Sequence, residues 1–297
     1  MGDVALVSSP VEMLRAAGHE AWLLSRSPFG ELFRFDDRVR VIQVERTEGF
    51  SSILERVQGR FDAVVDLHAK ALSRAITCLS GARIRHRVNK RVLARRLAVW
   101  FKRPIRFVPV HELYCRAVRD AIGLDGPCPL PRLWPGEFGI DLPPDFIALA
   151  PGAQHRTRSW PWFAELGELL ARGGRAVVWI GLEAEGPQDV RGLDLRGRTS
   201  LAELLFVISR ASALVSGDSG PMHLARATGV PVVALFGPTV PEFGFGPLSG
   251  GGVALEKKLA CRPCSLHGEK DCPKDLDCLM EIGPEEVIRA LEGVLQA

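Results

Sequence analysis

The sequence predicts an α/β protein with two Rossmann-like domains that face each other across a cleft. Three observations support this class: apolar, strand-like runs alternate with amphipathic helical runs, the alternation restarts halfway along the chain, and a proline-rich stretch separates the halves. Strands separated by helices pair in parallel, so each half is expected to form its own parallel sheet. The length of 297 residues is enough for two domains of ordinary size.

The expected strands lie at 20–25, 39–44 and 61–67 in the first half and at 146–150, 176–181, 213–215 and 231–236 in the second. Helices fit between them. The stretch from Gly126 to Pro144 holds six prolines and no clear periodicity, which is typical of an interdomain linker. The domains are therefore expected at 1–141 and 142–297, with the last helix able to pack back on the first domain.

The start of the chain departs from this pattern. Gly2-Asp3-Val4 leads directly into a helical pattern over 9–17, although the first helix of a Rossmann unit normally follows a strand. A parallel sheet that lacks an inner strand leaves strand edges uncovered. The sequence thus predicts either a start assigned too late or a gap that a local rearrangement or another segment fills.

Composition and charge describe a globular protein, with 46% hydrophobic and 25% charged residues. The net charge of +3 is too small to imply nucleic acid, and no nucleic-acid motif is present. Its distribution is uneven, since no Asp or Glu and twelve Lys or Arg lie between Leu67 and His111. The apolar runs are too short to span a membrane and the N-terminus has no signal-like segment, so we expect a cytoplasmic protein.

The most informative motif is the run from Val215 to His223, with the sequence VSGDSGPMH, followed by the apolar strand 231–236. It predicts a strand, a tight turn, a helix and another strand. The unpaired amides of a helix start carry the positive end of the helix dipole. A nucleotide's diphosphate is therefore expected to bind at this turn.

Several motifs together resemble glycosyltransferase family 9, the bacterial lipopolysaccharide heptosyltransferase family. They are GDVAL with the following SP at 2–10, RSWP at 158–161, GRTSLAEL at 197–204, DSGPMH at 218–223 and ALFGPT at 234–239. The resemblance runs from Gly2 to the last helix. It implies the two-domain GT-B fold, a nucleotide sugar bound mainly to the C-terminal domain, and sugar transfer with inversion and without a required metal or cofactor.

The resemblance implies that Asp3 is the catalytic base. An inverting single displacement needs one carboxylate to remove the proton of the acceptor hydroxyl. Asp3 matches the N-terminal Asp of the family, and a neighbouring helix start favours its ionised form. The alternative is an Asp that caps the helix.

The resemblance also implies a set of donor-binding residues. Arg158 matches a basic position that contacts the diphosphate, where a guanidinium can bind two oxygens at once. Asp218 matches a position that contacts the donor, Glu183 one that binds the ribose, and Thr199 one that flanks the base. The remaining residues of this set are Ala153, Gln154, Ser219, Gly220 and His223.

Each of these residues also has a purely structural interpretation. Arg158 can be a solvated charge, His223 a core or cap histidine, and Asp218 a carboxylate that bonds loop amides. Glu183 can be an exposed acid, and Thr199 can be a helix N-cap.

The acid-free basic segment predicts a strongly anionic partner. Ten of its cations fall between Arg83 and Arg106, close to Trp100 and Phe101. The resemblance implies an anionic glycolipid acceptor, with Lys70 and Arg74 on the acceptor side, and peripheral contact with the anionic inner face of the inner membrane. A solvated helix face is the alternative.

Four of the seven cysteines cluster at Cys261, Cys264, Cys272 and Cys278. Four thiolates can bind a structural zinc, with reduced thiols or a local disulfide as alternatives, because the later spacings are not those of a zinc ribbon. Cys78, Cys115 and Cys128 are interpreted as isolated structural residues. A cytoplasmic location argues against stable disulfides.

The combined hypothesis is an inverting transferase that moves heptose from ADP-L-glycero-D-manno-heptose to the inner core of lipopolysaccharide. A transferase for another nucleotide sugar is the close alternative, and an inactive sugar-nucleotide-binding protein is a third. An NAD-dependent dehydrogenase is disfavoured, because no G-x-G-x-x-G motif follows any expected strand.

Overall fold

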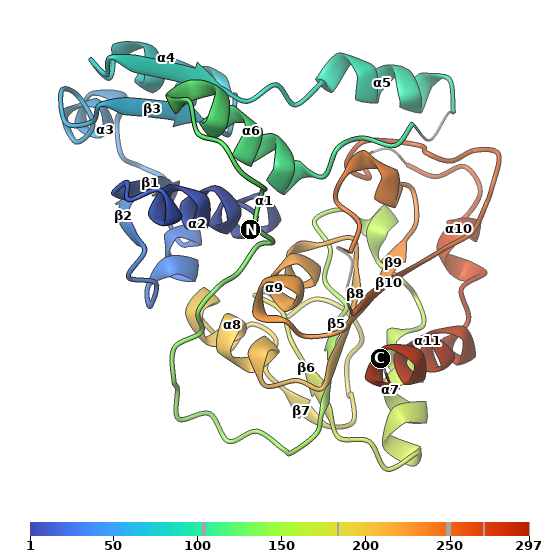
Figure 1. The fold of residues 1–297 in the computed structure, drawn as a ribbon. Helices are drawn as coiled ribbons and strands as arrows, with labels where there is room; N and C mark the ends of the chain where they lie inside the picture. Colours follow the sequence, from blue (N-terminus) through green and yellow to red (C-terminus); the bar gives the residue numbers. More distant parts are fainter. Residues whose placement is uncertain (103–104, 183, 248–250, 270, 297) are drawn as a thin grey trace. The chain divides into compact units, whose positions relative to one another are not determined.

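The computed structural model describes residues 1–102, 105–182, 184–247, 251–269 and 271–296 (Figure 1). The chain divides into two compact units. Unit 1 holds Met1, Asp3–Val92 and Val108–Trp134, and unit 2 holds Gly2, Leu93–Phe107 and Pro135–Ala297. Within the described residues, no helix is both long enough and apolar enough to cross a bilayer.

Unit 1 contains two separate parallel strand pairs. Strand β1 (Ala21–Arg26) pairs with β2 (Val39–Val44), and β3 (Ala63–Asp66) pairs with β4 (Ile84–Arg87). No strand joins the two pairs in the part of the chain that the structure describes. The helices of this unit are α1 (Gly2–Ala5), α2 (Ser8–Ala16), η1 (Phe29–Phe33), α3 (Phe50–Glu55), α4 (Ala71–Leu79) and α6 (Val110–Ile122).

Helix α6 is the element on which unit 1 is assembled. It contacts both β3 and β4 and packs against α2, which in turn contacts β1. Met13 of α2 and Val118 of α6 form a buried cluster with Cys115. Helix packing therefore connects the strand pairs in place of a continuous sheet.

The prediction for two of the isolated cysteines was wrong. Cys115 in α6 and Cys128 form a disulfide across 13 positions of sequence. The chain turns back after α6, where Gly123 adopts a left-handed conformation (φ 69°), and this return brings the two Cα atoms to 5.7 Å. The third cysteine, Cys78, is exposed and unpaired.

Unit 2 is built on a six-stranded parallel sheet in the order β10-β9-β8-β5-β6-β7. The strands are β5 (Ile147–Ala150), β6 (Val177–Trp179), β7 (Leu193–Asp194), β8 (Ala213–Gly217), β9 (Val232–Phe236) and β10 (Gly252–Glu256). The helical segments are α5 (Val92–Trp100), η2 (Arg156–Arg158), α7 (Phe163–Arg172), α8 (Leu201–Ser209), α9 (Gly220–Thr228), η3 (Pro241–Phe243), α10 (Asp277–Met280) and α11 (Pro284–Gln296).

Helices cover both faces of this sheet, with α8 and α9 on one side and α7 and α11 on the other (Figure 1). Strands β5, β8 and β9 are buried along their whole length, which explains their continuous apolar sequences. Trp179 packs over Gly167 of α7, where an added Cβ would lie 2.5 Å from the Trp179 ring. The predicted α/β class with parallel sheets is confirmed by this architecture.

Removing the disulfide should destabilise the protein measurably. Cys128→Ser frees a loop of 13 residues in the unfolded chain, so we expect the free energy of unfolding to fall by about 3 kcal/mol. Denaturant titration under oxidising conditions measures this loss, and Cys78→Ser is the matched control with no loss. A Cys128→Ser variant as stable as the parent protein without reductant would contradict the bond.

Candidate functional site

The candidate site of unit 2 lies where the sheet changes direction. From β5 the chain continues to β6 and β7 on one side and then returns to β8 on the other side of β5. Ligands of open α/β sheets bind beyond the carboxyl ends of the strands at such a switch point. The register pairs Ala150 with Ser216, so the loops that follow β5 and β8 leave the sheet side by side.

The structure brings Arg158 and Asp218 together at this switch point. Arg158 ends η2 in the loop after β5, and Asp218 follows β8 directly. Arg158 Nη2 lies 3.7 Å from Asp218 Oδ2, and each side chain is 13% exposed. The site thus contains a mostly buried guanidinium beside a carboxylate, both open to solvent on one side.

Asp218 is held by a second contact. Thr239, just after β9, donates its hydroxyl to Asp218 Oδ2 at 2.7 Å. The backbone amide of Asp218 donates to the carbonyl of Leu235 at 3.1 Å. Asp218 is therefore fixed within unit 2 by a hydroxyl and by its own backbone amide, and its donor-binding role stays a prediction.

Arg158 is held by the cysteine-bearing loop, which is the segment between β10 and α10 with Cys261, Cys264 and Cys272. Its Nη1 donates to the carbonyl of His267 at 3.2 Å, while its buried Nε has no hydrogen-bond partner among the described residues. Behind it, Trp160 Nε1 donates to the carbonyl of Ile282 at 2.9 Å. The guanidinium is thus held at the switch point by a backbone carbonyl and the Asp218 carboxylate.

Helix α9 starts at this site. Its N-cap, Ser219, bonds the hydroxyl of Ser216 at 2.9 Å and does not cap the helix with its side chain. The first-turn amides that begin at Gly220 are therefore left uncapped beside Arg158 and Asp218, which suits an anion. His223 lies in the same turn, 8% exposed, with its ring against Phe245.

The loop after β5 also contributes to this edge of the sheet. Ala153 donates its amide to Glu185 Oε2 at 3.1 Å, and Gln154 is exposed. The sequence had pointed to Glu183, which lies outside the described residues. Glu185, two positions further on, is the acid that the structure places against this loop, and the only sequence signal for it was a second acid in the same segment.

Thr199 precedes helix α8 without capping it. The N-cap is Ser200, whose hydroxyl accepts from the amide of Glu203 at 3.3 Å in a capping box. The Thr199 hydroxyl is buried and has no hydrogen-bond partner among the described residues. The cap interpretation of Thr199 is therefore wrong.

The candidate base lies in unit 1. Asp3 sits in the first turn of α1 and its Oδ2 lies 3.2 Å from Lys90 Nζ, which follows β4. His68, after β3, is nearby, and burial together with the Lys90 charge lowers the pKa of its imidazole. The Asp66 carboxylate accepts hydrogen bonds from the backbone amides of His68 and Ala69 and so fixes the turn after β3. Lys90 and His68 were not singled out from the sequence.

The two acceptor candidates lie close to this turn. Lys70 is the N-cap residue of α4 and Arg74 lies one turn further along the same helix. Both side chains are exposed. They therefore present positive charge from one helix end of unit 1.

The four clustered cysteines are not joined by disulfides. Burial raises the pKa of the Cys264 thiol, and burial raises that of Cys278 to about 11, so both thiols are protonated near neutral pH. Among the described residues, no group of three or more ligand-type side chains has the arrangement of a metal site. A structural zinc therefore stays a prediction, which elemental analysis of the purified protein checks.

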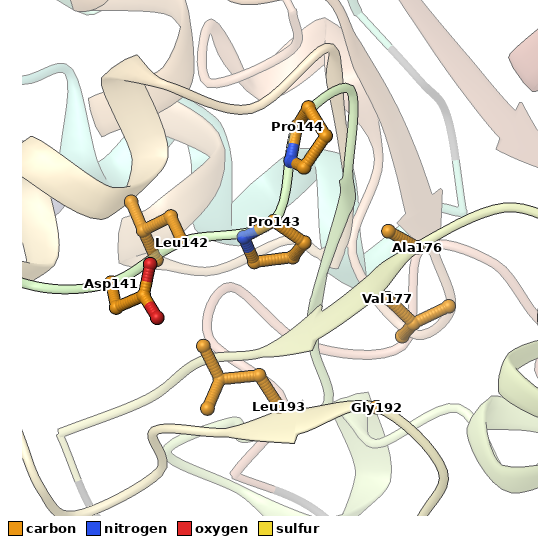
Figure 2. Close-up of a pocket in the computed structure, with 8 residues that line it drawn as sticks. All are labelled: Asp141, Leu142, Pro143, Pro144, Ala176, Val177, Gly192 and Leu193. Carbon is orange, nitrogen blue, oxygen red and sulfur yellow. The ribbon is translucent and has the colours of Figure 1, made fainter.

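A separate hollow lies at the other edge of the sheet. Figure 2 shows it between the segment that precedes β5 and the first residues of β6 and β7, with Asp141, Pro143, Val177 and Leu193 in its lining. This is the amino-terminal edge of the strands, away from the switch point. Its apolar and proline-rich lining offers no group for a diphosphate.

We predict that Gly268→Ala weakens anion binding at Arg158. Gly268 has a φ of 80°, and an added Cβ would lie 2.6 Å from Arg158 Cδ, so the guanidinium must shift. The loss of a charged hydrogen bond should raise the Kd for inorganic pyrophosphate by about tenfold or more in calorimetry. Gly174→Ala, with a φ of 77° and no neighbour within 4 Å, is the matched control. Equal affinities of the two variants would contradict the positioning.

Comparison with known proteins relates this geometry to a family. The model of glycosyltransferase family 9 (heptosyltransferase) matches residues 52–271. Lipopolysaccharide heptosyltransferase 1 of Pseudomonas aeruginosa is 31% identical over 195 residues, which cover 54% of each chain. The matched segments span from 32% to 54% of the length of the curated relatives.

Solved structures share the fold at low sequence identity. A family 9 glycosyltransferase from Veillonella parvula has a TM-score of 0.77 at 19% identity and covers 99% of this chain and 94% of its own. The E. coli ADP-heptose lipopolysaccharide heptosyltransferase II has a TM-score of 0.73 at 22% identity, with 98% and 95% covered. The family match extends over most of unit 2, including Arg158, Asp218 and α9, and the resemblance predicted from the sequence is confirmed: the chain belongs to glycosyltransferase family 9.

Proposed function

We propose that this protein transfers heptose from ADP-L-glycero-D-manno-heptose to a sugar of the lipopolysaccharide inner core. The observation that carries the proposal is the grouping of Arg158, Asp218 and the start of α9 at the switch point of a family 9 chain. Two of the proteins named above are heptosyltransferases, and one of these is named for ADP-heptose. We also propose that the protein acts at the cytoplasmic face of the inner membrane.

The chemistry proposed is a single displacement with inversion and without a required metal. The acceptor oxygen forms a bond to the anomeric carbon while the bond from that carbon to the β-phosphate oxygen breaks, and ADP leaves. Arg158 and the first amides of α9 would stabilise the charge that develops on the leaving diphosphate. The acceptor proton would pass to the Asp3 carboxylate.

Two buried polar atoms of unit 2 support this proposal. Arg158 Nε is buried without a partner among the described residues, and the Thr199 hydroxyl is in the same state. Burying an unpaired polar atom costs about 1–3 kcal/mol, so a side-chain rearrangement on ligand binding that paired either atom would recover that energy. The proposed diphosphate and nucleoside would supply those partners.

A protein that binds the sugar nucleotide without transferring it is the second candidate. The observation that favours it is the ion pair between Asp3 and Lys90, because the ammonium lies 3.2 Å from the carboxylate oxygen that would accept the proton. Donor binding without turnover would support this candidate over the transferase.

Donor identity is tested by calorimetry with ADP-heptose, ADP-glucose and a UDP-sugar. We expect ADP-heptose to bind most tightly, and Arg158→Ala to raise its Kd by about tenfold or more through loss of charged hydrogen bonds. Arg172→Ala is the control, since this exposed arginine lies at the end of α7 and pairs only with Glu168 among the described residues. Tighter binding of the UDP-sugar would reject the proposed donor, and an unchanged Kd would reject Arg158.

The role of Asp3 is tested by Asp3→Asn. Loss of a general base should lower turnover by about 10²–10⁴-fold while the donor Kd is retained. Release of ADP in the presence of a lipopolysaccharide acceptor measures turnover. Asp37→Asn, on an exposed acid of the same unit, should change neither quantity. Near-normal turnover of Asp3→Asn would remove it as the base.

A further inference from the structure

Helix α5 has an unusual outer face. Leu93, Leu97 and Trp100 follow one another at helical spacing on α5. Beyond the end of the helix, Phe101 and Ile105 are exposed as well. Leu93 is 71%, Trp100 80% and Phe101 65% exposed. A helix on the surface of a globular domain normally turns polar side chains outward. The outward face of α5 is instead largely apolar.

The other face of α5 is already used for packing. Ala98 and Val99 are buried in a cluster with Phe107, Val240 and Phe243 of the same unit. The amide of Phe107 also donates to the carbonyl of Glu242 at 2.8 Å. The exposed row therefore belongs to a helix that is fixed on unit 2, and burying it in the domain would require removing the face that now packs.

The segment that carries the exposed row is rich in positive charge. Arg96 and Arg106 are exposed, and among the described residues neither has an acidic group within ion-pair distance. No Asp or Glu occurs anywhere between Leu67 and His111. Lys102 is also exposed, although its ammonium donates to the carbonyl of Pro263 at 3.0 Å.

We propose that this surface, made of Leu93, Leu97, Trp100, Phe101 and Ile105 with Arg96 and Arg106, docks on an anionic lipid bilayer. Apolar side chains that enter the headgroup region, with arginines beside them, are the features by which short amphipathic helices bind such membranes. Trp is well suited to the headgroup region, because its ring is apolar while its N–H can hydrogen-bond to polar groups there.

Charge complementarity selects a bilayer over another occupant. A second copy of this chain would bring the same arginines against themselves, and this repulsion disfavours self-association through the face. An anionic bilayer satisfies the arginines and the apolar row at the same time. The inference deepens the proposed location at a membrane, and vesicle binding tests it separately from sugar transfer.

Co-sedimentation with vesicles of phosphatidylcholine alone, or mixed with phosphatidylglycerol, tests the proposal on the whole protein. We expect binding to the anionic vesicles that weakens with added salt, and little binding to the neutral ones. Arg96→Gln with Arg106→Gln should lower the anionic partition coefficient by about thirtyfold, at about fivefold for each cation near the surface. Arg175→Gln with Arg289→Gln removes the same charge elsewhere in unit 2 and should leave most of the binding intact.

The apolar row is tested by Trp100→Ser with Phe101→Ser, which should lower the partition coefficient by about tenfold or more. Leu130→Ser with Met280→Ser removes two apolar side chains that are exposed elsewhere and is the control. Because a double variant can lose its fold, Trp100→Phe provides a second measurement: it should keep binding but remove the fluorescence quenching caused by brominated lipids.

Two outcomes would overturn the proposal. One is anionic-vesicle binding that is unchanged in both double variants, or that never occurs. The other is concentration-dependent dimerisation in sedimentation velocity that Trp100→Ser with Phe101→Ser abolishes, with no vesicle binding by the parent protein. That second result would assign the face to a protein interface.

Discussion

The parallel pairing of β5 with β8 is the constraint on which the donor-side site depends. It sends two loops out of the sheet at the same edge, and they approach so closely that a Cβ on Gly217 would lie 3.0 Å from the carbonyl oxygen of Arg158. A side chain at that position would push the Arg158 carbonyl aside by a few tenths of an ångström, which favours glycine there. This backbone contact brings Arg158 beside Asp218, because Asp218 follows Gly217 directly.

The cysteine-bearing segment then determines which way Arg158 points. Arg262 is buried at its start and donates to the carbonyl of Thr239 at 2.8 Å and to Glu256 at 2.8 Å. The segment is thereby anchored to the ends of β9 and β10, and its later carbonyl at His267 reaches Arg158. One anchored loop thus contacts Thr239, which holds Asp218, and also contains His267, which holds the Arg158 guanidinium. A ligand diphosphate would compete with the neutral His267 carbonyl for Nη1 of Arg158 and with the Asp218 carboxylate for Nη2. The carbonyl is the weaker of these two partners.

The sequence was most informative where burial is complete. Strands β5, β8 and β9 are buried throughout and, apart from Ser216 in β8, contain only apolar residues and glycine. They were predicted within two residues at either end, because a central parallel strand is covered on both faces. Strands β4, β7 and β10 were missed. The β4 sequence, IRHR, is mostly exposed, β7 has only two residues, and β10 is half-buried along its length, so none has a hydrophobic pattern of its own. Their existence depends on neighbouring strands.

The same limit applies to the basic segment, where a count of cations overstates the charged surface. Arg95 is buried with its guanidinium between the rings of Phe107 and Phe245, at 5.5 Å from each centroid, and Arg85 donates to the carbonyl of Cys78 at 2.8 Å. Arg95 thus packs against aromatic rings, and Arg85 bonds a carbonyl in the last turn of α4. Local sequence cannot separate them from Arg96 and Arg106, because all four lie in equally basic surroundings. Only the packing of α5 on Val240 and Phe243 decides which side of the helix is outward, and it turns Leu93, Trp100 and Arg96 to the solvent together.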